Sequence, residues 1–133
     1  MEQKEIEQKV LEYQMIDQRI SHLREQIRTA DEQILEMASV LRSIDDFSAY
    51  GPDTEMLVPL SNGIFAHAIL KKEEKFLVNV GALVVVDKSP EETKQIISRQ
   101  KEDLATVREE MSENLRRIIS KAADIERILK DNL

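Results

Sequence analysis

The first 46 residues carry apolar side chains in a seven-residue repeat. Two series of positions, offset by three residues, recur at every seventh residue, and Lys9 is their only polar member. The series are Ile6, Tyr13, Ile20, Ile27, Ile34 and Leu41, and Lys9, Ile16, Leu23, Ala30, Met37 and Ile44. A stripe of this period, sustained without Gly or Pro, is typical of a coiled-coil helix. We therefore predict a single helix over residues 1–46, which is longer than the usual amphipathic helix of a globular protein.

A second coiled-coil helix is predicted over residues 90–132. Ser89, Pro90 and Glu92 match a capping box, in which Ser and Glu bind each other's backbone amides and Pro takes the first helical position. The predicted stripe is Ile97, Gln100, Leu104, Val107, Met111, Leu115, Ile118, Ala122, Ile125 and Leu129. Its two successive steps of four, from Val107 to Leu115, indicate a stutter that locally unwinds the supercoil.

The two predicted helices match in length, with 39 residues from Ile6 to Ile44 and 39 from Glu91 to Leu129. Because both adjoin one connecting segment, they pack most simply antiparallel, and the numbers of facing residues then sum to about 135. At about 1.5 Å per residue, the resulting arm is roughly 58 Å long. We expect the connecting segment at one end of this arm and both chain termini, exposed to solvent, at the other.

Residues 47–90 hold every Gly and Pro, and residues 54–88 are predicted to form two β-hairpins. Asn62-Gly63 separates the apolar runs 56–60 and 64–70, and such a pair predicts a type I′ turn with positive φ at both central positions. Gly81-Ala82 separates the runs 76–80 and 83–86. The run from Ala82 to Val86 does not alternate, so both of its faces should be covered.

Strands this short cannot form a self-sufficient core, and they leave sheet edges unpaired. We therefore expect the hairpins to pair with other subunits. The predicted interface residues are Phe76, Leu83, Val84, Val85 and Val86. The alternative is that these residues pack only beneath the helices of their own chain.

Apolar residues outside the two stripes gather at the ends of the predicted arm and avoid its middle. Leu35, Val40 and Ile96 lie near the hairpins, and the remaining ones lie near the chain termini. An apolar patch kept in solvent usually marks an interaction site. The predicted binding surface comprises Ile6, Val10, Leu11, Met15, Ile119, Ile125, Leu129 and Leu133. Ile6, Ile125 and Leu129 also belong to the stripes, so they serve both purposes only if the helix ends separate. The alternative is that the patch merely closes a frayed coiled-coil end.

Composition narrows the possible functions of the 133-residue chain, a length that fits one domain. With no Cys there is no disulfide, thiol nucleophile or thiolate metal site, and three glycines cannot build a phosphate-binding loop. A net charge of -7 argues against nucleic acid or an anionic membrane as the main partner. No apolar run is long enough for a membrane span or a signal peptide.

The titratable residues form no recognisable catalytic or metal-binding constellation. The two histidines, His22 and His67, are far apart in the sequence, and the carboxylates are spread over both predicted helices. We therefore expect no enzymatic activity, no metal and no cofactor.

Two coiled-coil helices flanking two hairpins, with the sequences LVPLSNGIFAHAIL over residues 57–70 and VNVGALVVVDKSPEE over residues 78–92, resemble the alpha class of the prefoldin family. The resemblance covers the whole chain as a single domain, and two hairpins favour the alpha class over the beta class. It implies an α+β fold in which the hairpins of two alpha and four beta subunits assemble into a β-barrel body that carries six coiled coils.

The resemblance also implies a function. Prefoldin is a cytoplasmic, nucleotide-independent chaperone that captures unfolded proteins and passes them to a group II chaperonin. The alternative that the residues leave open is a coiled-coil scaffold or tether that binds folded partners.

Overall fold

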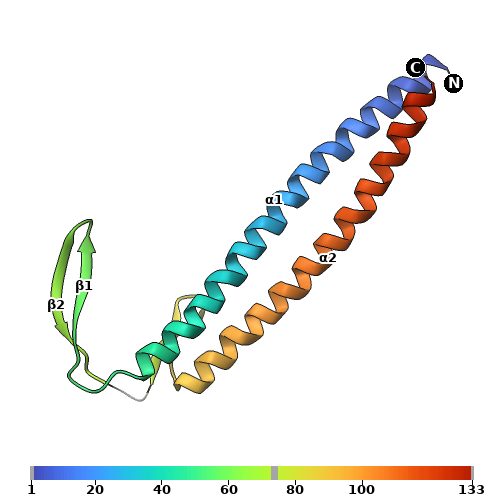
Figure 1. The fold of residues 1–133 in the computed structure, drawn as a ribbon. Coiled ribbons are helices and arrows are strands. Elements are labelled where there is room, and N and C mark those ends of the chain that lie inside the picture. The colour runs from blue at the N-terminus through green and yellow to red at the C-terminus, as the bar shows by residue number, and fades with distance from the viewer. Residues whose placement is uncertain (1, 73–74, 133) are drawn as a thin grey trace. The chain divides into compact units, whose positions relative to one another are not determined.

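The computed structural model describes residues 2–72 and 75–132 of the chain. Along the sequence, four strands lie between two long helices, α1 (Gln3–Ser48) and α2 (Pro90–Asp131). The strands are β1 (Glu55–Ser61), β2 (Ile64–Ile69), β3 (Phe76–Gly81) and β4 (Val84–Lys88) (Figure 1). The chain forms two compact units: a terminal unit of Met1–Glu36 with Lys101–Leu133, and a central unit of Met37–Gln100.

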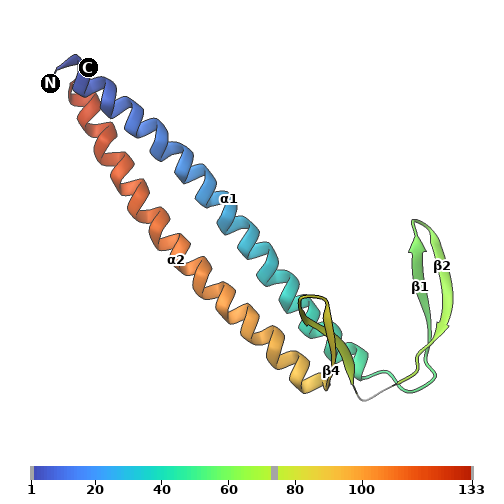
Figure 2. The same cartoon turned by 180° about the vertical axis from the view of Figure 1, so that it is seen from behind.

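The terminal unit is an antiparallel pair of helices, as the sequence predicts. Figures 1 and 2 show the terminal-unit parts of α1 and α2 running side by side, with the start of α1 next to the end of α2. Two ion pairs cross between the helices: Arg108 Nε lies 2.9 Å from Asp31 Oδ1, and Lys121 Nζ lies 3.8 Å from Glu12 Oε1. Both join residues that the predicted antiparallel register places nearly opposite each other.

The core of the terminal unit is built from the predicted stripes. Five residues form a buried cluster: Ile16, Leu23, Ile118, Ala122 and Ile125. The residues packed against it are Tyr13, Ile20, Leu115 and Leu129. All nine belong to the stripes, so the heptad pattern places the core here correctly. The apolar stripes of the two helices form a common seam. Burying this seam yields a free energy of about 25 cal/mol per Å² of apolar surface, which is the main contribution that holds the two helices together.

The predicted stutter in α2 is wrong. Val107 is 42% exposed and Gln100 is also exposed, whereas Lys101 and Arg108 are partly buried. Replacing Gln100 and Val107 by these two basic residues gives a stripe whose steps alternate regularly between four and three. The helix therefore keeps an uninterrupted heptad, which lets α2 follow the continuous stripe of α1. The long stems of Lys101 and Arg108 can cover apolar surface while their charged ends reach water or a partner, as Arg108 does with Asp31.

Each hairpin in the central unit forms its own two-stranded antiparallel sheet. The first pairs Glu55 with Ile69 at its open end and Ser61 with Ile64 beside the turn. Its register shifts between Pro59 and Ser61, and at the turn Gly63 has a φ of 76° while Asn62 does not have a positive φ. The predicted type I′ turn is therefore wrong, because a bulge with one left-handed glycine closes this hairpin instead.

The second hairpin has the turn that was predicted for the first. Ala82 and Leu83 have φ values of 50° and 62°, so both central residues are left-handed. Leu83 consequently lies in the turn, and β4 begins at Val84, one residue later than predicted.

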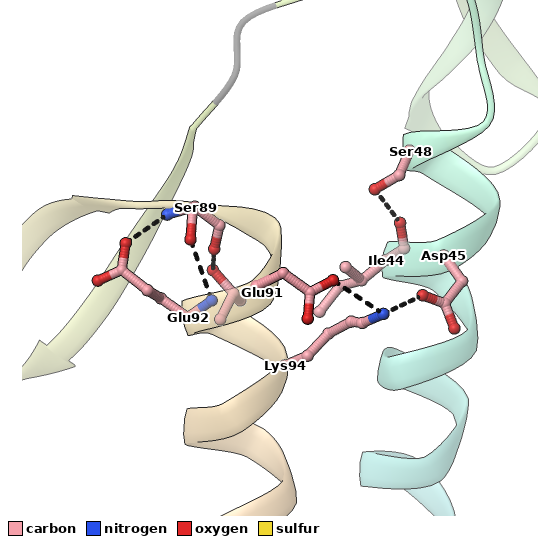
Figure 3. A network of polar contacts seen from close by, with 8 residues as sticks. Ile44, Asp45, Ser48, Ser89, Glu91, Glu92 and Lys94 are labelled. Atoms are coloured by element: carbon pink, nitrogen blue, oxygen red, sulfur yellow. Dashed lines mark hydrogen bonds and ion pairs between the residues drawn. The ribbon is translucent and has the colours of Figure 1, made fainter.

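The predicted capping box begins α2 (Figure 3). The Ser89 backbone N–H donates to Glu92 Oε1 over 3.2 Å, and the Glu92 backbone N–H donates to Ser89 Oγ over 3.1 Å. The bond that the Glu92 carboxylate accepts from the Ser89 backbone is the main cause that holds the pKa of Glu92 below its ordinary value, and the Ser89 side chain adds to the effect. Two residues further on, Lys94 Nζ lies 2.6 Å from Asp45 Oδ1, which ties the start of α2 to the last turns of α1.

Candidate functional site

Four apolar side chains near the helix ends of the terminal unit are exposed to solvent. We call Val10, Leu11, Met15 and Ile119 the tip patch. Leu11 and Met15 are the most exposed of them, at 58% and 61%. They lie one helical turn apart on α1, so they are adjacent on one face of the helix. All four side chains are therefore available to contact another molecule.

The other predicted tip residues are placed differently. Ile125 is only 3% exposed and belongs to the buried cluster, and Leu129 packs against that cluster. Ile6 is half-buried in the seam. These three could contact a ligand only if the helix ends separated, as the sequence implies. Leu133 lies outside the described residues.

Ion pairs surround the tip patch. Lys9 Nζ lies 3.3 Å from Glu12 Oε2, and the other oxygen of Glu12 pairs with Lys121 of the facing helix. Further along α2, Lys130 pairs with Glu126. These pairs match part of the charge close to the exposed apolar side chains.

The predicted interface residues of the second hairpin divide into two groups. Leu83 is 91% exposed, and Val84 and Val85 are also exposed, so nothing in the described chain covers them. Phe76 and Val86 are half-buried, and the ring of Phe76 lies 5.8 Å from that of Phe47 at the end of α1. Packing beneath the chain's own helices therefore accounts for Phe76, but it does not account for the exposed residues at the turn and the start of β4.

The first hairpin carries an apolar surface that the sequence-based selection missed. Its exposed apolar residues are Leu57, Val58, Leu60, Ile64, Phe65 and Ile69. The signal was available, because the run Leu57–Leu60 and the run Ile64–Leu70 place apolar residues on both faces of the hairpin. Together with strands that have only one partner each among residues 2–72 and 75–132, these side chains leave both hairpins open to further pairing.

Other kinds of site are not found in the part of the chain that the structure describes. No group of three or more His, Asp or Glu residues there is arranged to hold a metal ion. No described helix has the length and apolar character needed to cross a bilayer.

Comparison with known proteins identifies the family of the chain. The model of the prefoldin subunit family matches residues 16–133. A prefoldin subunit alpha from Thermofilum pendens is 30% identical over 115 residues, which cover 86% of this chain and 89% of the relative. The chain belongs to the prefoldin family. A prefoldin subunit alpha from Archaeoglobus fulgidus is 24% identical over 96% of this chain and 93% of its own length, which agrees with the alpha class.

A solved prefoldin structure has the same fold. A chain in the cryo-EM structure of filamentous PFD from Methanocaldococcus jannaschii matches with a TM-score of 0.77 and 21% identity. The match covers 86% of this chain and 95% of that one. As an alpha-class prefoldin, the chain is a subunit of a molecular chaperone. Its exposed apolar residues are therefore candidates for contacts with other proteins.

Proposed function

We propose that this prefoldin chain captures unfolded proteins at the tip patch and delivers them to a group II chaperonin without using nucleotide. The observation that carries the proposal is the tip patch itself, four apolar side chains kept in water beside a well-formed core. Unfolded proteins expose the apolar segments that such a patch can bury.

The size of the patch suits a chaperone that must release its client. Each apolar side chain contributes roughly 1.5–3 kcal/mol when fully buried, and these partly exposed ones contribute less. One chain would therefore bind a client weakly, whereas several chains in one assembly would retain it through avidity. Each contact could still open, which a transfer to another chaperone requires.

Assembly is proposed to occur through the hairpins, with beta-class subunits in a hexamer of two alpha and four beta chains. The exposed apolar residues on both hairpins and the unpaired strand edges support this part of the proposal. The native mass of the chain, alone and after mixing with a beta-class subunit, would test it.

Client capture can be tested by changing Val10, Leu11, Met15 and Ile119 together to Ser. We expect the assembly to keep its native mass, because these side chains lie outside the buried cluster. The concentration needed to suppress aggregation of a denatured protein should rise about tenfold or more, since at least one apolar contact per arm is lost. Light scattering during dilution of the denatured protein provides the measurement.

A control variant changes Leu35 and Val107 to Ser, because both are exposed apolar residues of the terminal unit outside the tip patch. It should suppress aggregation as the unmodified chain does. Unchanged activity of the tip variant would refute the proposal. Binding to one folded partner, with no binding to denatured proteins, would favour the scaffold or tether instead.

A further inference from the structure

A groove of about 290 Å³ lies between the two helices of the terminal unit, away from the tip patch. Its floor includes Leu104 and Met111 of α2. Its rim on α1 includes His22, Gln26, Thr29 and Gln33. The sequence gives no hint of a binding surface here, because the apolar residues outside the stripes avoid this part of the helices.

The groove exists because the side chains between the two helices fill less space at this level. Ala30 presents a single methyl group at a stripe position where neighbouring heptads of α1 present Leu23 and Met37. On α2, the continuous heptad brings Arg108 to the seam in place of Val107, and its guanidinium pairs with Asp31. Leu104 and Met111 line the groove together with Ala30, and both remain only partly buried.

The rim has an unusual chemistry for this chain. The spacing of His22, Gln26, Thr29 and Gln33 places them along one side of α1. None of them is Lys, Arg, Asp or Glu, although these four types make up 34% of the residues in the chain. Within residues 2–72 and 75–132, their side chains make no hydrogen bond. Glu25 is the one charged residue of the lining, and it is paired with Arg28.

We propose that this groove is a second contact site for unfolded polypeptide, specific for a short, extended segment without charged side chains. The proposal rests on the proposed function and adds a location and a substrate class to it. Apolar side chains of the segment would pack on Leu104 and Met111, where the flexible thioether of Met111 adapts to different shapes. The amides, hydroxyl and imidazole of the rim would bond to the backbone N–H and C=O groups of the segment, which need partners when they leave water.

The dimensions fit such a segment. From His22 to Gln33 the helix rises by about 17 Å, which corresponds to roughly five residues of extended chain. A second copy of this chain is a poorer occupant, because 34% of its residues are charged and such residues would lose water against an apolar floor.

Site-specific photocrosslinking tests the location. The full-length chain, in its assembled form, carries benzoylphenylalanine at position 29 or, as a control, at the exposed position 21, which lies outside the groove lining. The probe is a fluorescein-labelled peptide of alternating leucine and serine. We expect about tenfold more labelling from position 29 than from position 21, as a local contact requires. Equal labelling from the two positions would overturn the proposal.

The same experiment in the tip variant separates this proposal from the proposed function. Labelling from position 29 should persist there, even if aggregation is no longer suppressed. Loss of that labelling would show that the groove is not an independent site. Crosslinks from position 29 to another subunit in the absence of peptide would identify the groove as an assembly interface and would also overturn the proposal.

A charge variant tests the chemistry of the rim without touching the seam. Gln26→Glu combined with Gln33→Glu places two anions beside the groove and should weaken binding of the peptide about tenfold, because a bound segment would leave them poorly hydrated. Ser21→Glu combined with Thr106→Glu makes the same change of charge at exposed positions outside the lining and should leave binding unchanged. Equal affinities for the two variants, both with native helix content by circular dichroism, would contradict the assignment.

Discussion

Single residues in this chain differ sharply in how much of the helix pairing depends on them. Ile125 is 3% exposed at the centre of the buried cluster, whereas Ile119, on the same helix, is 39% exposed in the tip patch. The two are chemically identical, so comparing them isolates the effect of burial. Their difference also separates the role of the seam from the role of the exposed patch.

Ile125→Ala should lower the free energy of unfolding by about 2–5 kcal/mol, because it removes buried methyl groups and leaves a cavity. Ile119→Ala should lower it by less than about 1 kcal/mol, as expected of a partly exposed position. Chemical denaturation followed by circular dichroism gives both values. Similar losses in the two variants would contradict the placement of the core.

The carboxylate of Glu92 makes the free energy of unfolding depend on pH in the acid range. Its hydrogen bonds with Ser89 lower its pKa in the folded state, so the folded protein favours the carboxylate. The stabilisation is present above the ordinary pKa of about 4.3 and is lost as the pH falls through the lower folded-state pKa.

Glu92→Gln should therefore lose less stability than the unmodified chain when the pH falls below about 4.3. Glutamine can still accept the bond from the Ser89 backbone, so helix content should stay the same. Thermal melts across the acid range test this expectation. Parallel losses of stability in the two proteins would show that the carboxylate of Glu92 does not contribute to the pH dependence.

At the scale of the secondary-structure elements, the second hairpin combines an unfavourable backbone with an exposed side chain. Ala82 and Leu83 both have positive φ, and Leu83 is the most exposed of the large apolar residues. A left-handed conformation costs a residue with a side chain roughly 1–2 kcal/mol. Asparagine and glycine adopt positive φ at a lower cost, so the turn itself does not favour leucine at this position. Burial against another subunit would explain its presence.

Leu83→Gly should accordingly have opposite effects on the stability of the chain alone and on its assembly with other subunits. The chain alone should keep its stability or gain up to about 1 kcal/mol, because glycine adopts positive φ without strain. Assembly with a beta-class subunit should weaken, because the apolar side chain is lost.

Sedimentation velocity over a range of concentrations would measure the assembly of this variant. Leu83→Asn, which also tolerates a left-handed backbone, should behave in the same way. Assembly that is unchanged in both variants would remove Leu83 from the proposed interface.

At the scale of the whole molecule, the sequence predicts what depends on local pattern. The heptads give both helices and the buried cluster, the capping box gives the start of α2, and the Gly-containing turns give two hairpins. The exposure of the tip patch is also predictable, because most positions outside a heptad stripe face solvent in a pair of helices.

The errors arise where one element constrains another. Hydrophobicity favours Val107 for the seam, but a continuous heptad beside α1 requires Arg108. Asn62-Gly63 favours a two-residue turn, but the shift in strand register introduces a bulge. The groove beside Ala30 was not predicted because it depends on which residues of α2 face that position. The proposed hairpin interface could not be assigned from one chain for the same reason, since its partners would belong to other chains.

The closeness of the two chain ends in the terminal unit has a practical consequence (Figures 1 and 2). Dyes attached at Glu2 and Asn132, just outside the ends of α1 and α2, would form a short-range energy-transfer pair. The efficiency of energy transfer would fall if a bound client separated the helix ends and exposed Ile125. It would stay high if clients bind only to the outer surface of the helices. A bulky fusion at either end would sit beside the tip patch, so reporters for binding studies are better placed elsewhere.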